Sequence, residues 1–224
     1  LHQFFPYITS LDKQGITIRH LLTHSSGFKS YIPFYKNKFI DTEEEIVKAI
    51  IESELDYEPG TKIVYSDLGF ILLSNIINKI SGKQIDELSH KWYYKPLKMN
   101  STQFNPSLNL MNLIAPTEID NLYRKRLIHA EVHDENAFLM DGISGHAGLF
   151  SNSMDIAKYG QIWLDKGLSN GRRLIHADQI KKFTTRESLN GKEYTLGWDI
   201  PSKNQDSSAG DYFSLSSIGH LGFT

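Results

Sequence analysis

The feature that most constrains the fold is one long amphipathic segment that follows Tyr65-Ser66-Asp67. Ser66 or Asp67 can cap the N-terminus of a helix there, and Gly82 is placed to end it. Between these positions large apolar residues recur every three or four residues, at Phe70, Leu73, Ile76, Ile77 and Ile80. The spacing predicts a helix of about four turns that buries this one face.

Shorter elements are expected on both sides of this helix. Asp41 and Thr42 precede Glu44 and Glu45 in a capping-box pattern, which predicts a helix that runs to about Leu55. Further helices are expected over 16–24, 85–93, 153–164 (capped by Ser153) and 177–183, and extended strands over 194–200 and 212–218. The long irregular stretch over 100–148 is expected to carry function. Helices in the middle and strands late fit an α/β or α+β domain.

Composition excludes several classes of protein. The chain has 224 residues, of which 40% are hydrophobic and 22% charged, and this is typical of a globular domain with its own core. A formal net charge of −2, without a Lys/Arg run, gives no reason to expect nucleic acid as a partner. The apolar runs are far too short for a membrane span. The absence of cysteine excludes disulfides, cysteine nucleophiles and thiolate metal sites.

Four blocks of sequence stand out in order along the chain: ITIRHLLTHSSGF, PGTKIVYSDLGFILL, GHAGLFSNSMDIAKYGQ and GHLGFT. Together they resemble the serine β-lactamase and penicillin-binding-protein family of the class C β-lactamase type, from about Leu1 to Thr224. The segments APTEID, VHDENAF and GHAGLF resemble a narrower branch of penicillin-binding-protein-like hydrolases. The resemblance implies a β-lactamase-like fold, in which a helical subdomain lies beside an antiparallel sheet with the active site between them.

The same resemblance implies acyl transfer through a covalent serine ester. A serine hydroxyl becomes nucleophilic when a nearby lysine takes its proton, and a tyrosine close to that lysine can pass the proton to the leaving group. Tyr65 is the candidate for that tyrosine. Without the resemblance, Tyr65 would be interpreted as a half-buried aromatic residue at a strand end.

By resemblance, His220-Leu221-Gly222 corresponds to the Lys-Thr-Gly or His-x-Gly strand of the family. Gly222 would let the backbone approach the substrate, and the N–H of Phe223 would be one oxyanion donor. A histidine, mostly neutral at pH 7, anchors a substrate carboxylate less strongly than a lysine does. His220 therefore favours an ester or a D-amino-acid peptide over a β-lactam as substrate.

Asp67 departs from the commoner family pattern, which has asparagine at this position. An ionised aspartate can only accept hydrogen bonds and repels a nearby carboxylate. As a substrate-binding residue it would favour a substrate that presents a donor or a cation. A purely structural role as a helix cap is an equally weighted alternative.

Histidines and acidic residues gather in the irregular stretch. His133, Asp134, Asn136 and His146 are expected to buttress or line the active-site cleft and to contribute to substrate binding. His129 and His133, four residues apart, invite a metal interpretation. Arg124, Lys125 and Arg126 crowd that segment, and the serine-hydrolase branch needs no metal, so no metal and no cofactor are predicted.

The nucleophile is the missing part of the pattern. Ser10 to Lys13 and Ser26 to Lys29 satisfy Ser-x-x-Lys, but neither is followed by the apolar pattern of a buried helix that would hold both side chains on one face. Both are interpreted as chance matches to the pattern, and the functional serine and lysine are expected before Leu1. Because the family also continues beyond Thr224, residues 1–224 are expected to form one partial domain that is inactive by itself.

The leading hypothesis is therefore a serine hydrolase of the penicillin-binding-protein, carboxypeptidase or esterase type. It would act on a D-amino-acid peptide or a small ester, in the periplasm or at the cell surface, and could work with other domains of a longer parent chain. One alternative is a catalytically dead module of the same fold that holds cell-wall peptide or a partner domain. Another is a D-stereospecific aminopeptidase in which Asp67 holds a substrate ammonium.

Overall fold

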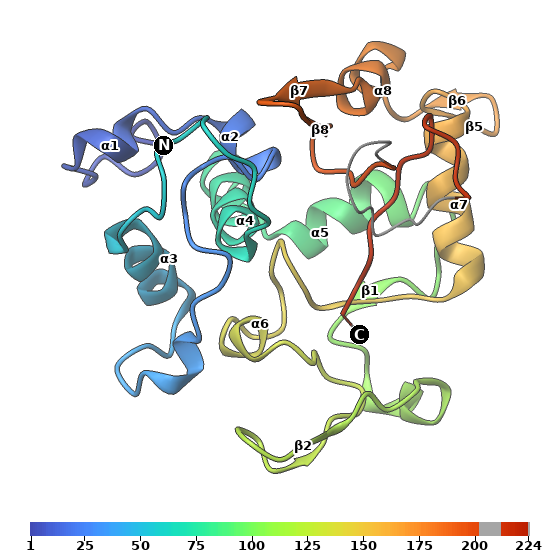
Figure 1. Ribbon diagram of the computed structural model, residues 1–224. Coiled ribbons are helices and arrows are strands. Elements are labelled where there is room, and N and C mark those ends of the chain that lie inside the picture. Colours follow the sequence, from blue (N-terminus) through green and yellow to red (C-terminus); the bar gives the residue numbers. More distant parts are fainter. Residues whose placement is uncertain (202–211, 224) are drawn as a thin grey trace. The chain divides into compact units, whose positions relative to one another are not determined.

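The computed structural model describes residues 1–201 and 212–223 (Figure 1). The helices are α1 (Leu11–Gln14), α2 (Ile18–Leu22), α3 (Glu43–Glu52), α4 (Asp67–Ser81), α5 (Ile85–Ser89), α6 (Glu135–Leu139), α7 (Ser153–Leu164) and α8 (Ala177–Thr184). Two 3₁₀ helices, η1 (Phe34–Lys36) and η3 (Leu108–Leu113), and one π-helix, η2 (His90–Tyr94), lie between them. None of the described helices is long and apolar enough to cross a membrane.

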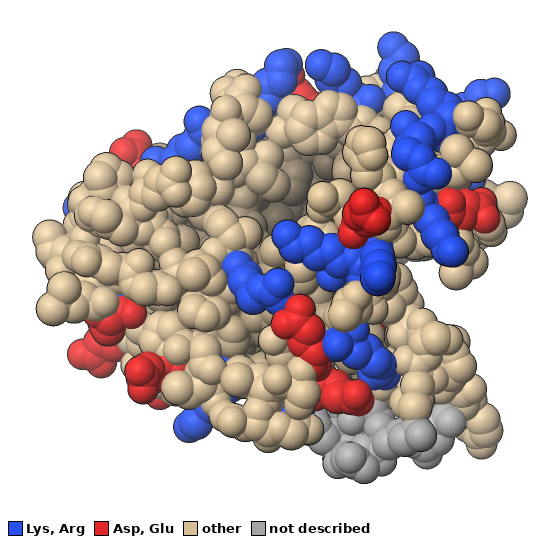
Figure 2. Space-filling model, turned by 90° about the horizontal axis from the view of Figure 1, so that it is seen from above, with Lys and Arg blue, Asp and Glu red and all other residues tan. Residues whose placement is uncertain are grey.

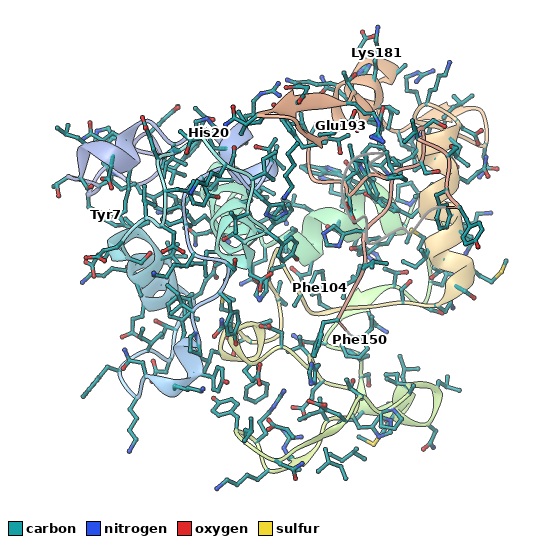
Figure 3. The ribbon with its side chains drawn as sticks, in the orientation of Figure 1. Tyr7, His20, Phe104, Phe150, Lys181 and Glu193 are labelled. Carbon is teal, nitrogen blue, oxygen red and sulfur yellow. The ribbon has the colours of Figure 1, made fainter. Side chains whose placement is uncertain are left out.

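The strands pair in short antiparallel ladders. They are β1 (Gln103–Phe104), β2 (Ile119–Asp120), β3 (Arg126–Leu127), β4 (Leu149–Phe150), β5 (Leu168–Ser169), β6 (Arg172–Arg173), β7 (Glu187–Leu189) and β8 (Lys192–Tyr194). The described strands form four two-stranded sheets, β1–β4, β2–β3, β5–β6 and β7–β8. In the first sheet Gln103 pairs with Phe150, and Figure 3 shows Phe104 and Phe150 on this ladder.

The described chain divides into two compact units, and each has its own buried residues. Unit 1 contains Leu1–Ser30, Glu54–Gly69 and the described part of Trp163–Phe223, and unit 2 contains Tyr31–Ser53 and Phe70–Ile162. The largest fully buried apolar side chains of unit 1 are Phe5, Ile16, Leu21, Phe28 and Leu68. Those of unit 2 are Ile46, Ile50, Ile71, Leu72, Ile128 and Ile162.

The capping box predicted for the third helix is confirmed. The Thr42 hydroxyl accepts a hydrogen bond from the Glu45 N–H, and the Glu45 carboxylate accepts one from the Thr42 N–H, each at 3.2 Å. The helix ends at Glu52, three residues before the predicted end at Leu55. Asn75 of α4 donates to Glu43 of α3 at 3.0 Å, which joins the two helices inside unit 2.

Helix α4 begins and ends where the sequence predicts, but it buries a different face. Gly82 follows it with φ +67°, a backbone conformation that glycine adopts at little cost. The buried apolar residues are Leu68, Ile71, Leu72 and Ile76. Of the predicted stripe, Ile76 is thus buried, whereas Ile80 is 69% exposed. The predicted face was wrong because apolar residues surround most of this helix, so their spacing does not single out one stripe.

Two further predictions need correction. Asn152, not Ser153, caps α7, since its side-chain oxygen accepts the Asp155 N–H at 2.8 Å. Of the strands predicted over 194–200 and 212–218, only Tyr194 lies in a strand, at the end of β8. Beyond it, Asp199 makes one isolated bridge to Gly219. A strand persists when a neighbour pairs with it along its length, and this bridge supplies two hydrogen bonds, of 2.8 and 3.0 Å.

Candidate active site

A pocket of about 560 Å³ lies inside unit 1. Its walls come from 22–24, from Ile63 and Tyr65, from 192–195, from 197–200 and from 220–223. The chain thus brings the Tyr65 segment and the His220 segment, 155 positions apart in sequence, to one cavity. Gly222 and Phe223 also line it.

Tyr65 occupies this pocket with half of its surface exposed (51%). Its ring stacks on the imidazole of His24, with 4.5 Å between the ring centroids and 35° between the planes. The imidazole of His220 lies on the same tyrosine, at 5.9 Å between centroids. The tyrosine ring therefore contacts two imidazoles, and as a lining residue with half of its surface exposed it can be reached by a ligand in the pocket.

His24 was not predicted as a site residue. Its Nδ1 accepts the Ser66 N–H at 3.1 Å, which requires a ring nitrogen without a proton. The pKa of His24 is lowered to about 4, chiefly by burial, with smaller contributions from the nearby His220 and Lys192. The ring beneath Tyr65 is therefore neutral at physiological pH. The available signal in the sequence was its place at the end of a predicted helix, just before Gly27. In the structure His24 lies in the turn after α2, with a φ of 53°.

Backbone contacts fix the start of α4 below the pocket. Ser66 is buried, and its hydroxyl donates to the Lys29 carbonyl at 2.6 Å. Asp67 is the first residue of α4, and its N–H donates to the Ser30 carbonyl at 3.0 Å. A carboxylate at the N-terminus of a helix is stabilised by the helix dipole. Both interpretations of Asp67, as a helix-terminal carboxylate and as a substrate contact, are compatible with this position.

The His220 segment lines the pocket without forming the predicted strand. His220 is exposed, and its Nδ1 lies 2.7 Å from the Leu221 carbonyl, to which the protonated nitrogen donates. Phe223 is 94% exposed. The preceding Gly219 makes the bridge to Asp199, which places this segment on the pocket wall.

The hairpin that closes one side of the pocket was also missed. β7 and β8 pair in register from Glu187–Tyr194 to Leu189–Lys192, around a turn at Asn190-Gly191. Both turn residues have positive φ, 51° and 83°, and Asn-Gly is the preferred sequence for such a two-residue hairpin turn. The Asn190-Gly191 dipeptide was the signal in the sequence that could have predicted this hairpin.

Asp134 and His146 belong to unit 2, where they organise the loop around α6. Asp134 caps α6 by accepting the Ala137 N–H at 2.7 Å, and the same oxygen lies 2.9 Å from His146 Nε2. Burial opposes ionisation of Asp134, but the interaction with His146 and the N–H groups of Asn136 and Ala137 together lower the pKa of Asp134. His146 Nδ1 is 2.8 Å from the Ser144 hydroxyl. Ser144 is 3% exposed, so this Ser–His–Asp chain is closed to a substrate.

Asn136 hydrogen-bonds to backbone groups of unit 2. Its side chain is fully buried in unit 2, where its amide nitrogen donates to the Ile32 carbonyl at 2.8 Å and its oxygen accepts the Phe34 N–H at 3.0 Å. With both ends of the amide satisfied by backbone, Asn136 supports the 32–34 segment. These two hydrogen bonds buttress the backbone of that segment.

His129 and His133 form hydrogen bonds with different partners. His129 Nε2 lies 2.7 Å from the Ile114 carbonyl, and His133 Nε2 lies 2.6 Å from a Glu118 carboxylate oxygen. Arg124 donates to the His133 carbonyl and so fixes the backbone at this point. Over residues 1–201 and 212–223, no group of three or more His, Asp or Glu side chains is arranged to hold a metal ion.

Neither Ser-x-x-Lys pair has the arrangement of an activated serine. Ser10 precedes α1, a four-residue helix in which Lys13 is buried. Ser26 is 1% exposed, and the ammonium of Lys29 forms an ion pair with Asp56 at 2.8 Å. The hydrogen bond to Asp56 raises the pKa of Lys29, which is opposite to what a general base requires.

Comparison with known proteins gives consistent matches. The family model described as Beta-lactamase matches residues 1–224. An Escherichia coli (strain K12) protein named "Putative D-alanyl-D-alanine carboxypeptidase" is 34% identical over 239 residues, which cover 98% of this chain and 55% of that protein. A Bacillus subtilis (strain 168) protein named N-acetylmuramyl-L-alanine amidase is 34% identical over 231 residues, covering 95% of this chain and 52% of that protein.

A solved structure agrees with these matches. The octameric penicillin-binding protein homologue from Pyrococcus abyssi superposes with a TM-score of 0.60 and 25% identity, over 83% of this chain and 43% of that one. The chain spans about half the length of the curated relatives it matches. The β-lactamase-like fold and the α/β class predicted from sequence are confirmed.

Proposed function

Because the chain belongs to the beta-lactamase family, we propose that its protein is a serine hydrolase that works through an acyl-enzyme on D-amino-acid peptides of the cell wall. One observation carries the proposal: Tyr65 and His220 line one pocket, and the neutral His24 packs against the tyrosine ring. The names of the relatives, a carboxypeptidase for D-alanyl-D-alanine and an amidase, support this substrate class. A small ester is the alternative substrate.

In the proposed reaction a serine oxygen attacks the carbonyl carbon of the scissile amide, and the serine hydroxyl proton passes to the nearby lysine and from there to Tyr65. The tetrahedral intermediate collapses, the C–N bond breaks, and Tyr65 delivers the proton that the leaving amine needs. Water then hydrolyses the serine ester, and the second product leaves as a carboxylic acid. The Phe223 N–H would stabilise the oxyanion, while His220, Gly222 and Asp67 shape the site.

We place the nucleophilic serine and its lysine outside residues 1–224. The buried Ser26, the ion-paired Lys29 and the buried Lys13 support this assignment. Residues 1–224 alone are then inactive, and catalysis belongs to the whole protein. An extracytoplasmic location fits the same proposal, because peptidoglycan peptides are found outside the cytoplasm.

The test is acyl-adduct mass spectrometry with a fluorophosphonate and a fluorescent penicillin, on residues 1–224 and on the full-length protein. An adduct in the full-length protein only, on a serine outside residues 1–224, is the expected result. An adduct on Ser10 or Ser26 would overturn the placement of the nucleophile. No adduct on the full-length protein would overturn the acyl-enzyme and favour a module that only binds cell-wall peptide.

A further inference from the structure

We propose that Lys192 is the residue that binds the C-terminal carboxylate of the substrate, a specificity role that rests on the proposed function. Lys192 belongs to β8 and lines the same pocket as Tyr65 and His220. It is the only Lys or Arg among the residues described on the pocket wall. The substrate class is then a peptide with a free carboxylate, not an ester or an amide-capped peptide.

The position of the ammonium group carries the inference. Lys192 Nζ donates to the Ile63 carbonyl at 3.0 Å, and Ile63 lies two residues before Tyr65. An ammonium has three N–H groups, so this bond leaves donors for a ligand in the pocket. Within the described ranges no carboxylate lies within 4.0 Å of Lys192 Nζ. The charge is thus held beside Tyr65 without an acidic partner from the described chain.

The other charged or titratable groups of the pocket are less suited to this role. His24 is neutral and its Nδ1 accepts the Ser66 N–H. His220 uses Nδ1 on the Leu221 carbonyl. The acidic residues do not compete for Lys192: Glu193, labelled in Figure 3, pairs with Arg186 at 3.3 Å, and Asp199 accepts the Ile200 N–H at 2.9 Å.

The hairpin that bears Lys192 is held rigidly against the segment before Tyr65. Asn190 in the hairpin turn donates to the Thr61 carbonyl at 2.7 Å, parallel to the bond from Lys192 to Ile63. At the other end of the hairpin, Glu187 pairs with Arg19 at 2.7 Å. A side chain fixed in this way loses less conformational freedom when it binds a ligand, and this strengthens binding. Such a charge-assisted contact also discriminates a carboxylate from a neutral carboxamide.

The experiment uses the full-length protein and two matched peptides ending in D-Ala-D-Ala, one with a free carboxylate and one with a C-terminal carboxamide. The readout is the ratio of kcat/KM for the carboxylate peptide to that for the carboxamide peptide. Lys192→Met is expected to lower this ratio by about 10- to 100-fold, mainly through KM, because a hydrogen-bonded charge is lost. Lys192→Arg is expected to restore part of the ratio.

Figure 2 shows further Lys and Arg side chains on the surface seen from above, so the loss of one charge must be separated from the loss of a contact. Lys182→Met on α8 removes an exposed cation that does not line the pocket, and it should leave the ratio unchanged. If Lys192→Met lowers kcat/KM equally for both peptides, Lys192 only holds the Ile63 backbone in place, and the proposal is overturned. An unchanged ratio would overturn it as well. Failure of the proposed function is distinct, because the parent protein would then form no acyl adduct.

Discussion

His24 gives the sharpest physical prediction, because its protonation would break the hydrogen bond from the Ser66 N–H and place a charge on a largely desolvated ring. Its pKa is about 4 in the folded protein, compared with 6.5 for an exposed histidine. The unfolded chain therefore binds a proton between these two values and the folded chain does not. The stabilisation is complete above about pH 6.5 and is lost progressively as the pH falls towards 4.

The magnitude follows from the difference between the two pKa values. At about 1.36 kcal/mol for each pKa unit, His24 contributes about 3 kcal/mol to the pH dependence of unfolding, of which about 2 kcal/mol is already lost at about pH 5. His24→Asn removes the titrating group but keeps the structure. The Asn side-chain oxygen can accept the Ser66 N–H, and asparagine tolerates the φ of 53° at this position.

The assay is urea denaturation of parent and His24→Asn between about pH 7.5 and pH 5. Losing the stacking on Tyr65 should lower the stability of the variant by an amount that does not change with pH. The groups that face His24, namely Lys192, His220 and Tyr65, are present in both proteins, so their own titrations cancel in the comparison. The free energy of unfolding of the parent should fall by about 2 kcal/mol more than that of the variant. Parallel curves would refute the assignment of His24 as a buried neutral ring.

Three other predictions concern unit 2 and can be measured by the same denaturation experiment. Gly145→Ala should destabilise the protein by about 1–3 kcal/mol, because an added Cβ would clash with the Phe70 carbonyl and lie 3.1 Å from the Ser74 Cβ. Gly160→Ala in α7 should stabilise the protein by about 0.5–1 kcal/mol, because a Cβ added there meets no atom within 4 Å outside its own helix backbone and chain neighbours. A loss of stability in both variants would contradict the steric argument. Asn136→Ala should cost about 1–3 kcal/mol for each of the two backbone groups left unpaired, Ile32 C=O and Phe34 N–H, and a neutral result would remove its role as a buttress. Thr42→Ala should cost about 1 kcal/mol through loss of the cap of α3, and an unchanged midpoint would mean that this helix end frays without consequence.

Local signals in the sequence predicted the helix ends well. The Thr42–Glu45 capping box and the stretch from Asp67 to Gly82 are set by hydrogen bonds and φ angles within a few residues, so sequence alone locates them. The buried face of α4 is not local. Ile80 fits the apolar spacing but is exposed, since the surrounding chain decides which side of an almost wholly apolar helix is covered.

The prediction of strands late in the chain was wrong for a related reason. Residues 194–200 alternate in the manner of a half-buried strand, but Thr195 and Leu196 are both buried, so the backbone there does not follow a two-residue period. The hairpin lies just before this stretch, around Asn190-Gly191. Similarly, periodicity could not place Tyr65 beside His220; only the resemblance to a family linked segments so far apart.

The two residues that sequence reasoning missed, His24 and Lys192, have a common explanation. Lys192 keeps a positive charge near Tyr65, and that charge is one of the causes that lower the pKa of His24. A second cation on His24 would be poorly hydrated and would be repelled by Lys192, and both effects disfavour it. Burial is the largest cause of the neutral ring, and the ammonium fixed on the pocket wall adds to its effect. Replacing Lys192 by methionine should raise the pKa of His24, and an NMR titration of the His24 ring would measure this. An unchanged pKa would show that burial alone keeps the ring neutral.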